Sequence, residues 1–231
     1  YWVSEKMLTC FIQSQSLGKV FKLLAGTSTG DNTLYQRFWY EVNYNNISLY
    51  PDKSKRWFPC NTGGSFYKYA SNSTTVIDWE NDGCRIRNHI NGKGKIGSAI
   101  RNREYYFRSG ITWNKLSSSN FGVRFVPNGY ISDDTARMII SHSLEHQYYL
   151  LAFLCSNVCQ NFLTMLSPTL SFTNSELERL PYFESNKQDL YSNIINLSKD
   201  NHFQSLKDVS SFETSWDFVR HPLLPKRVVS G

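Results

Sequence analysis

The chain has 231 residues, of which 40% are hydrophobic and 15% aromatic, a composition that predicts a folded globular protein and excludes a disordered one. No apolar stretch approaches the roughly 20 residues that cross a bilayer, and the first residues do not resemble a secretory signal. The five cysteines are odd in number and form no Cys-x-x-Cys pair, which argues against a disulfide framework or zinc site and predicts reduced thiols in a cytoplasmic protein. Because the chain opens without Met, we expect it to be a piece of a longer protein.

Positive charge is concentrated in one stretch, residues 85–124. This basic stretch holds nine of the 25 Lys and Arg residues but only one of the 19 acids, Glu104, so that the rest of the chain is slightly acidic. Asparagines, aromatic residues and glycines lie between the cations. Fixed cations beside amides and flat rings suit a phosphate backbone and base edges, although charge alone equally allows a solvated surface.

The first 140 residues predict short strands between polar turns. We expect a helix at residues 4–11 and strands at 23–25 and 38–42, with a turn at 26–32. Further strands, rich in β-branched and aromatic residues, are expected at 75–79, 105–107, 111–113 and 123–126.

The remaining residues predict helices. Apolar residues with helical spacing from Leu144 to Phe162 predict a helix of about five turns, which the Ser167-Pro168 pair would end. A short helical turn at 175–178 and a helix at 187–197 follow. The chain closes with an apolar tail containing Phe212, Trp216 and Phe218.

Together these elements predict the α+β class. We expect a β-rich α+β domain with a long helix over residues 1–185, followed by a helical and irregular extension over residues 186–231. Trp57, Trp79 and Trp113 are expected in the core, and Cys155 and Cys159 on a buried helix face.

Motifs for chemistry are few. The glycine-rich run at 92–97 lacks the strand and helix that flank a nucleotide-phosphate loop. Asp78, Glu80 and Asp82 alternate as on one face of a strand and could gather a divalent cation, although such acids are usually just solvated. No Ser/His/Asp or Cys/His set stands out, so we assign no catalytic residue and no metal ligand.

A series of sequence motifs spans nearly the whole chain. In order they are GTSTGDN at 26–32, RFWYEV at 37–42, WFPCNTGG at 57–64, VIDWENDG at 76–83, RIRN at 85–88, YYF at 105–107, GITW at 110–113, SS at 117–118, FGVR at 121–124, SPTLSF at 167–172, LP at 180–181, FETSWDF at 212–218 and HPLL at 221–224. This collinear series resembles BREX phage-exclusion adenine-specific DNA methyltransferases of the PglX type. The chain departs from the family pattern at Thr62, Tyr67, Tyr69 and Cys155, which leaves the target sequence open.

The resemblance implies that this chain is the segment after the catalytic domain, and that residues 1–185 form a target-recognition-like domain, which holds duplex DNA and reads its sequence. The seven prolines are never adjacent, so the Asn-Pro-Pro-Tyr/Phe loop that meets the flipped adenine is missing from this chain. S-adenosylmethionine would bind the catalytic domain, and no cofactor is expected on this chain. The implied partners are double-stranded DNA, the catalytic methyltransferase domain of the same polypeptide and other phage-defence proteins, with no membrane.

Candidate DNA-binding residues follow from charge and amide chemistry. The cations would mainly neutralise phosphates, while the asparagines and a minority of the arginines would contact base edges. The candidates are Lys68, Arg85, Arg87, Asn88, Lys93, Lys95, Arg101, Asn102, Arg103, Arg108, Lys115 and Arg124. The glycines at 30, 63 and 64 are interpreted as turn residues with positive φ.

Two other classes of function remain open from the residues. One is a protein-interaction module of a defence complex, in which the basic stretch meets an acidic partner. The other is a metal-dependent nuclease centred on Asp78, Glu80 and Asp82. Duplex binding that weakens steeply with salt would favour DNA recognition, and divalent-dependent cleavage lost in Asp78→Asn would favour the nuclease.

Overall fold

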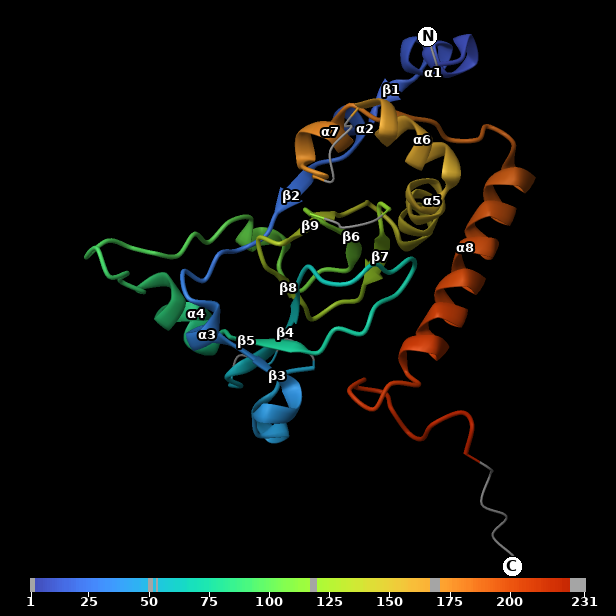
Figure 1. Cartoon of the computed structure of the whole chain (residues 1–231). Coiled ribbons are helices and arrows are strands. Elements are labelled where there is room, and N and C mark those ends of the chain that lie inside the picture. Colours follow the sequence, from blue (N-terminus) through green and yellow to red (C-terminus); the bar gives the residue numbers. More distant parts are fainter. Residues whose placement is uncertain (1–2, 50–51, 53, 117–119, 167–170, 225–231) are drawn as a thin grey trace, which may run out of the picture.

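Two four-stranded sheets, one two-stranded sheet and a set of helices make up the described part of the fold (Figure 1). The computed structural model describes residues 3–49, 52, 54–116, 120–166 and 171–224. The α+β class predicted from the sequence is confirmed. The serines at 117–118 and the expected helix end at Ser167-Pro168 lie outside the described residues.

The first sheet is fully antiparallel and lies against the helices. Its strands, in spatial order, are β2 (Leu23–Ala25), β9 (Ala136–Ile139), β6 (Gly110–Asn114) and β7 (Val123–Val126). Because side chains alternate along a strand, Ile111, Trp113 and Val123 point to the face covered by helices, where each is fully buried. Thr112 and Arg124 occupy the opposite face.

The second sheet is mixed. Its strands, in spatial order, are β3 (Gln36–Phe38), β5 (Thr75–Asp78), β4 (Trp57–Asn61) and β8 (Ile131–Ser132), antiparallel except for the parallel β4–β8 pair. The strand predicted at 38–42 is wrong, because β3 ends at Phe38 and a 3-10 turn, η1 (Trp39–Glu41), follows. The Glu41 carboxylate accepts a hydrogen bond from the Phe38 amide at 2.9 Å, which closes that turn, and a second turn, η2 (Tyr44–Asn46), comes next.

Polar side chains join the two sheets where they meet. The Asn61 amide donates to the Thr112 hydroxyl at 2.9 Å and to the Ser132 hydroxyl at 2.8 Å. Asn61 and Thr112 are almost completely buried, so these bonds replace water that both groups have lost. We call this region, with Arg124 and Asn114, the polar seam.

The helix predicted from Leu144 to Phe162 is two helices. They are α5 (Leu144–Cys155) and α6 (Asn157–Leu166), and their axes meet at 64°. Ser156 makes the break: its hydroxyl donates to the Phe153 carbonyl at 2.7 Å and accepts from the Cys159 amide at 3.1 Å, which caps α6. The bend turns Val158 towards solvent, so that it is 55% exposed although the helical spacing placed it on the buried face.

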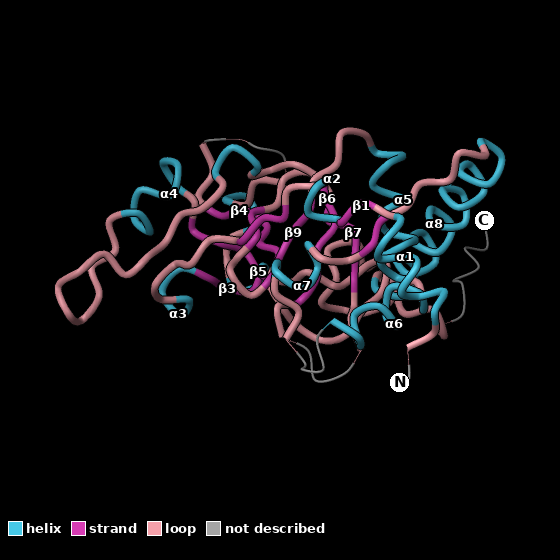
Figure 2. Tube along the Cα trace, turned by 90° about the horizontal axis from the view of Figure 1, so that it is seen from above, coloured by secondary structure: helices cyan, strands magenta, loops and turns pink. Residues whose placement is uncertain are grey.

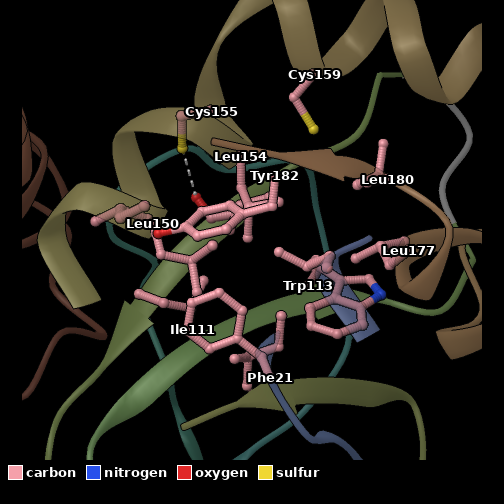
Figure 3. Packing of buried hydrophobic residues seen from close by; sticks show 14 of the residues in the cluster. Phe21, Ile111, Trp113, Leu150, Leu154, Cys155, Cys159, Leu177, Leu180 and Tyr182 are labelled. Atoms are coloured by element: carbon pink, nitrogen blue, oxygen red, sulfur yellow. Dashed lines mark hydrogen bonds between the residues drawn. The ribbon is translucent and has the colours of Figure 1, made fainter. Parts of the chain in front are cut away.

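The main core fills the space between the first sheet and these helices (Figure 3). Leu150 and Leu154 of α5 pack over Ile111 and Trp113 of β6. The predicted burial of Cys155 and Cys159 is confirmed, and burial raises the pKa of the Cys155 thiol to about 12. These free thiols therefore behave as small apolar core residues.

Short elements close the far end of this core. The helix predicted at 4–11 is α1 (Glu5–Gln13), which begins at the Ser4 cap. The remaining short elements here are β1 (Gln15–Ser16), α2 (Leu17–Val20), α7 (Asn174–Glu178) and β10 (Pro181–Tyr182), with β1 antiparallel to β10.

A long C-terminal helix, α8 (Gln188–Val209), runs along the outside of α5 (Figure 1). It extends well beyond the predicted residues 187–197, and His202 in this added part still contacts Tyr148 of α5. The Tyr148 hydroxyl lies 3.0 Å from His202 Nδ1, and the rings of Tyr149 and Tyr191 stack at 4.7 Å.

The apolar tail after α8 docks on the same chain. Trp216 stacks on Trp39 with ring centroids 5.1 Å apart, and the Trp39 indole donates to the Thr214 carbonyl at 2.9 Å. The Trp216 indole donates to the Ser73 carbonyl at 2.5 Å. The described part of the tail thus packs beside the second sheet, where Trp216 lies against the cluster that holds Trp57 and Val76.

Within the described residues, no single helix is both long and apolar enough to cross a membrane. Only α5 and α6 taken together would be, by length and composition, and the 64° bend separates them.

Candidate nucleic-acid interface

The basic stretch begins on α4 (Glu80–Arg87), whose first turn is built from left-handed residues. Asn81, Asp82 and Gly83 all have positive φ, at 48°, 61° and 70°. Gly83 also lies against the Trp79 ring, and an added Cβ would come within 2.7 Å of a ring carbon. Only glycine tolerates both the positive φ and the close contact with the ring. Local structure therefore accounts for the glycine that ends the Trp-Glu-Asn-Asp-Gly motif.

Because the strand ends at Asp78, the three acids that seemed to alternate do not share a face. Asp78 is 1% exposed and accepts bonds from the Arg56 guanidinium at 2.9 and 3.1 Å and from Arg85, whereas Glu80 and Asp82 are exposed. Two arginines therefore neutralise the buried carboxylate. The described residues hold no group of three or more His, Cys, Asp and Glu side chains arranged to bind a metal ion, so the structure gives the nuclease hypothesis no support.

After α4 the chain forms a narrow hairpin that projects from the body of the protein (Figures 1 and 2). We call residues 89–97 the basic finger. Its two arms are held by the antiparallel bridge between Ile90 and Ile96, with the bonds Asn91 N to Lys95 O at 2.8 Å and Gly97 N to His89 O at 2.9 Å. Lys93 and Lys95 lie at its tip and are exposed.

The base of the basic finger is clamped by the turn at 26–32. Ser28 and Ala99 exchange backbone bonds at 2.9 and 2.8 Å. Gly30, with φ 81°, lies so close to Gly97 and His89 that an added Cβ would come within 2.8 Å of both. The Tyr35 hydroxyl of α3 (Asn32–Tyr35) completes the clamp, 3.2 Å from His89 Nδ1.

The segment after the finger is irregular. The strand predicted at 105–107 is wrong: η3 (Arg103–Tyr105) is a 3-10 turn, and Phe107 has φ 65°. Arg101 donates to the Gly26 carbonyl at 3.2 Å, and Arg108 lies 5.7 Å from the centre of the Tyr105 ring. Both side chains are exposed and neither is in a salt bridge among the described residues, which also holds for Lys93 and Lys95.

Two of the predicted cations have acidic partners. Arg85 pairs with the buried Asp78, and Arg103 pairs with Asp82. Arg85 therefore serves the fold, and any contact that it makes with a phosphate would compete with that ion pair.

Four of the predicted residues are tied to the backbone or half-buried. Lys68 donates to the Cys155 carbonyl at 2.8 Å, Asn88 to the Cys84 carbonyl at 2.9 Å and Asn102 to the Ala25 carbonyl at 2.9 Å. The side-chain amides of Asn88 and Asn102 each donate a hydrogen bond within this chain. These bonds weaken the prediction that the two side chains contact DNA bases. Lys115 is half-buried beside β6.

Arg124 is a clear correction. It is 2% exposed and donates to Asn114 at 2.7 Å and to the Thr62 carbonyl at 3.0 Å, inside the polar seam. Burial lowers the pKa of its guanidinium to about 10, so it remains charged at neutral pH. A side chain in this position cannot reach a phosphate.

Arg137 of β9 was not predicted, because it lies outside the basic stretch. It pairs across the sheet with Ala25, next to the Gly26 carbonyl that Arg101 binds, so two guanidiniums lie at one end of the first sheet. Burial lowers the pKa of Arg137, Asp134 raises it and the nearby Arg101 lowers it. Arg87 is likewise half-buried, and the Nε atoms of both arginines have no hydrogen-bond partner among the described residues.

The fold is shared with a segment of a DNA-modifying enzyme. Over 88% of this chain, the structure resembles 30% of the Type IIL restriction-modification enzyme MmeI, which was solved in complex with DNA, with a TM-score of 0.58. Because the two are only 14% identical, this likeness establishes the fold alone.

Sequence comparison relates the chain to particular methyltransferases. It is 34% identical to the adenine-specific methyltransferase PglX of Lacticaseibacillus casei (strain Zhang) and 28% identical to the adenine-specific methyltransferase BrxX of Escherichia coli O9:H4 (strain HS), over 97% of this chain in both cases. No family model matches. The resemblance predicted from the motifs is thus confirmed. The chain spans about a fifth of the length of these relatives, 19% and 18%.

Proposed function

We propose that this chain is the target-recognition part of an adenine-specific DNA methyltransferase of a BREX phage-defence system, holding the duplex while another part methylates the base. The observation that carries the proposal is the set of exposed cations without acidic partners, among the described residues, on and beside the basic finger. Similarity to PglX and BrxX and the fold shared with MmeI support it.

In this proposal the cations of the basic stretch have two different roles. Lys93, Lys95, Arg101 and Arg108 neutralise phosphates, because no acid among the described residues competes for them. Arg85 and Arg103 position the segment through Asp78 and Asp82. S-adenosylmethionine would bind the catalytic domain, since this chain has no adjacent prolines and therefore no Asn-Pro-Pro loop.

Fluorescence anisotropy with a labelled duplex of about 30 base pairs tests this proposal. The triple variant Lys93→Glu, Lys95→Glu, Arg101→Glu should bind roughly 100-fold more weakly at about 100 mM salt, and the slope of log K against log salt should fall by about 1 for each phosphate that is no longer neutralised. The matched control reverses three exposed lysines elsewhere, Lys6, Lys19 and Lys187. Equally weakened binding in both variants, or unchanged binding in the first, would contradict the proposal.

A second candidate, an additional protein-interaction surface, is favoured by a hollow beside α8. The hollow has a volume of about 440 Å³ and is lined mainly by apolar side chains, among them Phe153, Phe183 and Leu197. Leu197 is 63% exposed and Phe183 38%. Leu197→Glu should leave duplex binding unchanged and abolish any co-purification with the catalytic domain, which size-exclusion chromatography of the mixed parts would measure.

A further inference from the structure

The basic finger carries an exposed apolar pair that its cations do not explain. Ile90 is 57% exposed and Ile96 66%, and both are β-branched residues on a projecting hairpin. No acidic residue occurs between His89 and Asn102, whereas Lys93, Lys95 and Arg101 do. The finger therefore presents apolar and positively charged groups together.

The register of the hairpin sets these two isoleucines side by side. The flanking bonds run from Asn91 N to Lys95 O and from Gly97 N to His89 O, so Ile90 and Ile96 form a non-hydrogen-bonded antiparallel pair. Side chains of such a pair are on the same face and approach more closely than in the other kind of pair. Strand alternation directs Lys95 to the opposite face.

The hairpin is held in shape before any ligand binds. The Asn91 side chain accepts bonds from the Lys93 amide at 3.0 Å and the Lys95 amide at 3.2 Å, and Gly94 has φ 71°. The turn at 26–32 clamps the base. A preorganised element loses little conformational entropy on binding, as a recognition element requires.

We infer that the basic finger enters the DNA major groove and that Ile90 and Ile96 contact thymine methyl groups there. This inference rests on the proposed DNA-recognition function and names the element and the base group that it reads. The major groove, about 12 Å wide, admits a two-stranded ribbon, whereas the minor groove is only about 6 Å wide. The thymine methyl group is the apolar feature of the major groove, and the lysines at the tip meet the phosphates on its rims.

The experiment uses the 231-residue chain and duplexes enriched by the wild-type protein from a random-sequence pool of about 30 base pairs. Replacing thymine by uracil in these duplexes removes only the methyl groups, and should weaken wild-type binding at least about fivefold. The double variant Ile90→Ser, Ile96→Ser should bind the thymine duplex as weakly as wild type binds the uracil duplex, with an unchanged salt slope. Ile12→Ser, at an 83% exposed position on α1, is the matched control and should bind like wild type.

The outcomes separate this inference from the proposed function. If the Lys93, Lys95, Arg101 reversal has no effect on binding, the proposed function itself fails. If that reversal weakens binding but uracil and the serine variants do not, only the inference about the finger fails. Competition by the minor-groove ligand distamycin, with no effect of uracil, would instead indicate that the isoleucines act as a minor-groove wedge and would overturn the major-groove assignment.

Discussion

Lys95 and Arg124 belong to the same basic stretch of sequence, yet they lie in opposite environments. Lys95 is exposed at the tip of the basic finger, where no acidic partner is within ion-pair distance among the described residues. Arg124 is 2% exposed in the polar seam and bonds Asn114 and Thr62.

The difference follows from the local backbone. Arg124 lies on β7, on the face of the first sheet that meets the polar seam, so a long polar side chain there must find its partners inside. Lys95 lies on a hairpin that projects from the body (Figure 2), and the bridge between Ser28 and Ala99 holds the base of this hairpin. Density of charge in a sequence therefore says little about which cations face solvent. Three pairs of substitutions test this division between buried charged groups that stabilise the fold and exposed cations that are proposed to bind DNA, and a fourth prediction concerns a buried histidine.

Removing Arg124 should have the largest effect on stability. Arg124→Met leaves the Thr62 carbonyl without its donor and weakens the Asn114 bonds, which should lower the free energy of unfolding by about 3 kcal/mol. Urea denaturation followed by tryptophan fluorescence measures this. Lys95→Met should change the same quantity by less than about 0.5 kcal/mol. If the two substitutions lower the free energy of unfolding equally, the distinction between a buried, stabilising Arg124 and an exposed Lys95 fails.

The two acid–arginine contacts should differ in the same way. Asp78→Asn removes a buried charge from between Arg56 and Arg85 and should cost about 2 kcal/mol of unfolding free energy. Asp82→Asn removes an exposed pair with Arg103, and a decrease below about 1 kcal/mol is expected. Thermal unfolding of both variants decides the point; a larger decrease for Asp82→Asn would mean that the exposed pair holds the segment together.

Displacing the finger without touching its tip tests whether its placement matters. Gly30→Ala introduces a Cβ against Gly97 and His89 at a residue with φ 81°, which should cost about 1–2 kcal/mol and shift the finger. Duplex affinity in the anisotropy assay should fall as well. Gly92→Ala, where an added Cβ meets nothing within 4 Å, is the control. If a folded Gly30→Ala protein binds the duplex with wild-type affinity, the position of the basic finger does not determine duplex binding.

The smallest effect concerns pH and a buried titratable group outside the basic stretch. Burial lowers the pKa of His202 below its ordinary value of 6.5. The unfolded chain then binds this proton more readily than the folded one, so stability is full above pH 6.5 and declines as the pH falls from there towards the lower folded pKa. Urea midpoints between about pH 7.5 and 5 should decline more in wild type than in His202→Gln. Parallel declines would assign the pH dependence to other groups.

Much of the fold was predictable where side-chain patterns are local. The strands at 23–25 and 123–126 coincide with β2 and β7, and the predicted burial of Trp57, Trp79 and Trp113 is confirmed. These predictions hold because β-branched and aromatic residues favour strands and because large aromatic rings are mostly buried.

Failures occurred where one local or tertiary contact outweighs a pattern. The helical spacing from Leu144 to Phe162 continues through Ser156, but the Ser156 hydroxyl caps a new helix and bends the chain by 64°. Gly63 and Gly64 have no positive φ, although Gly30 does; Gly63 instead lies against Thr135, where a side chain would not fit. Close tertiary approach, which the sequence does not contain, therefore explains the glycine at 63 better than its backbone angles.

The candidate site was predicted only as a region. Sequence located the basic stretch and, through its motifs, the resemblance to adenine-specific methyltransferases, because charge and motif order are properties of the linear chain. The sequence did not show which side chains lie together in space. Asp78 forms ion pairs with Arg56 and Arg85, and Arg137, on a strand outside the basic stretch, lies near Arg101.

By itself, then, the sequence determined the class of elements, the aromatic core and the concentration of positive charge, since these depend on residue type and short-range spacing. The tertiary structure decided which cations are available to a ligand. Whether a cation is available depends on its neighbours in space. Asp78 on the preceding strand neutralises Arg85, and Asn114 on the neighbouring strand binds the buried Arg124. The turn at 26–32 holds the base of the basic finger, whose lysines are exposed to solvent.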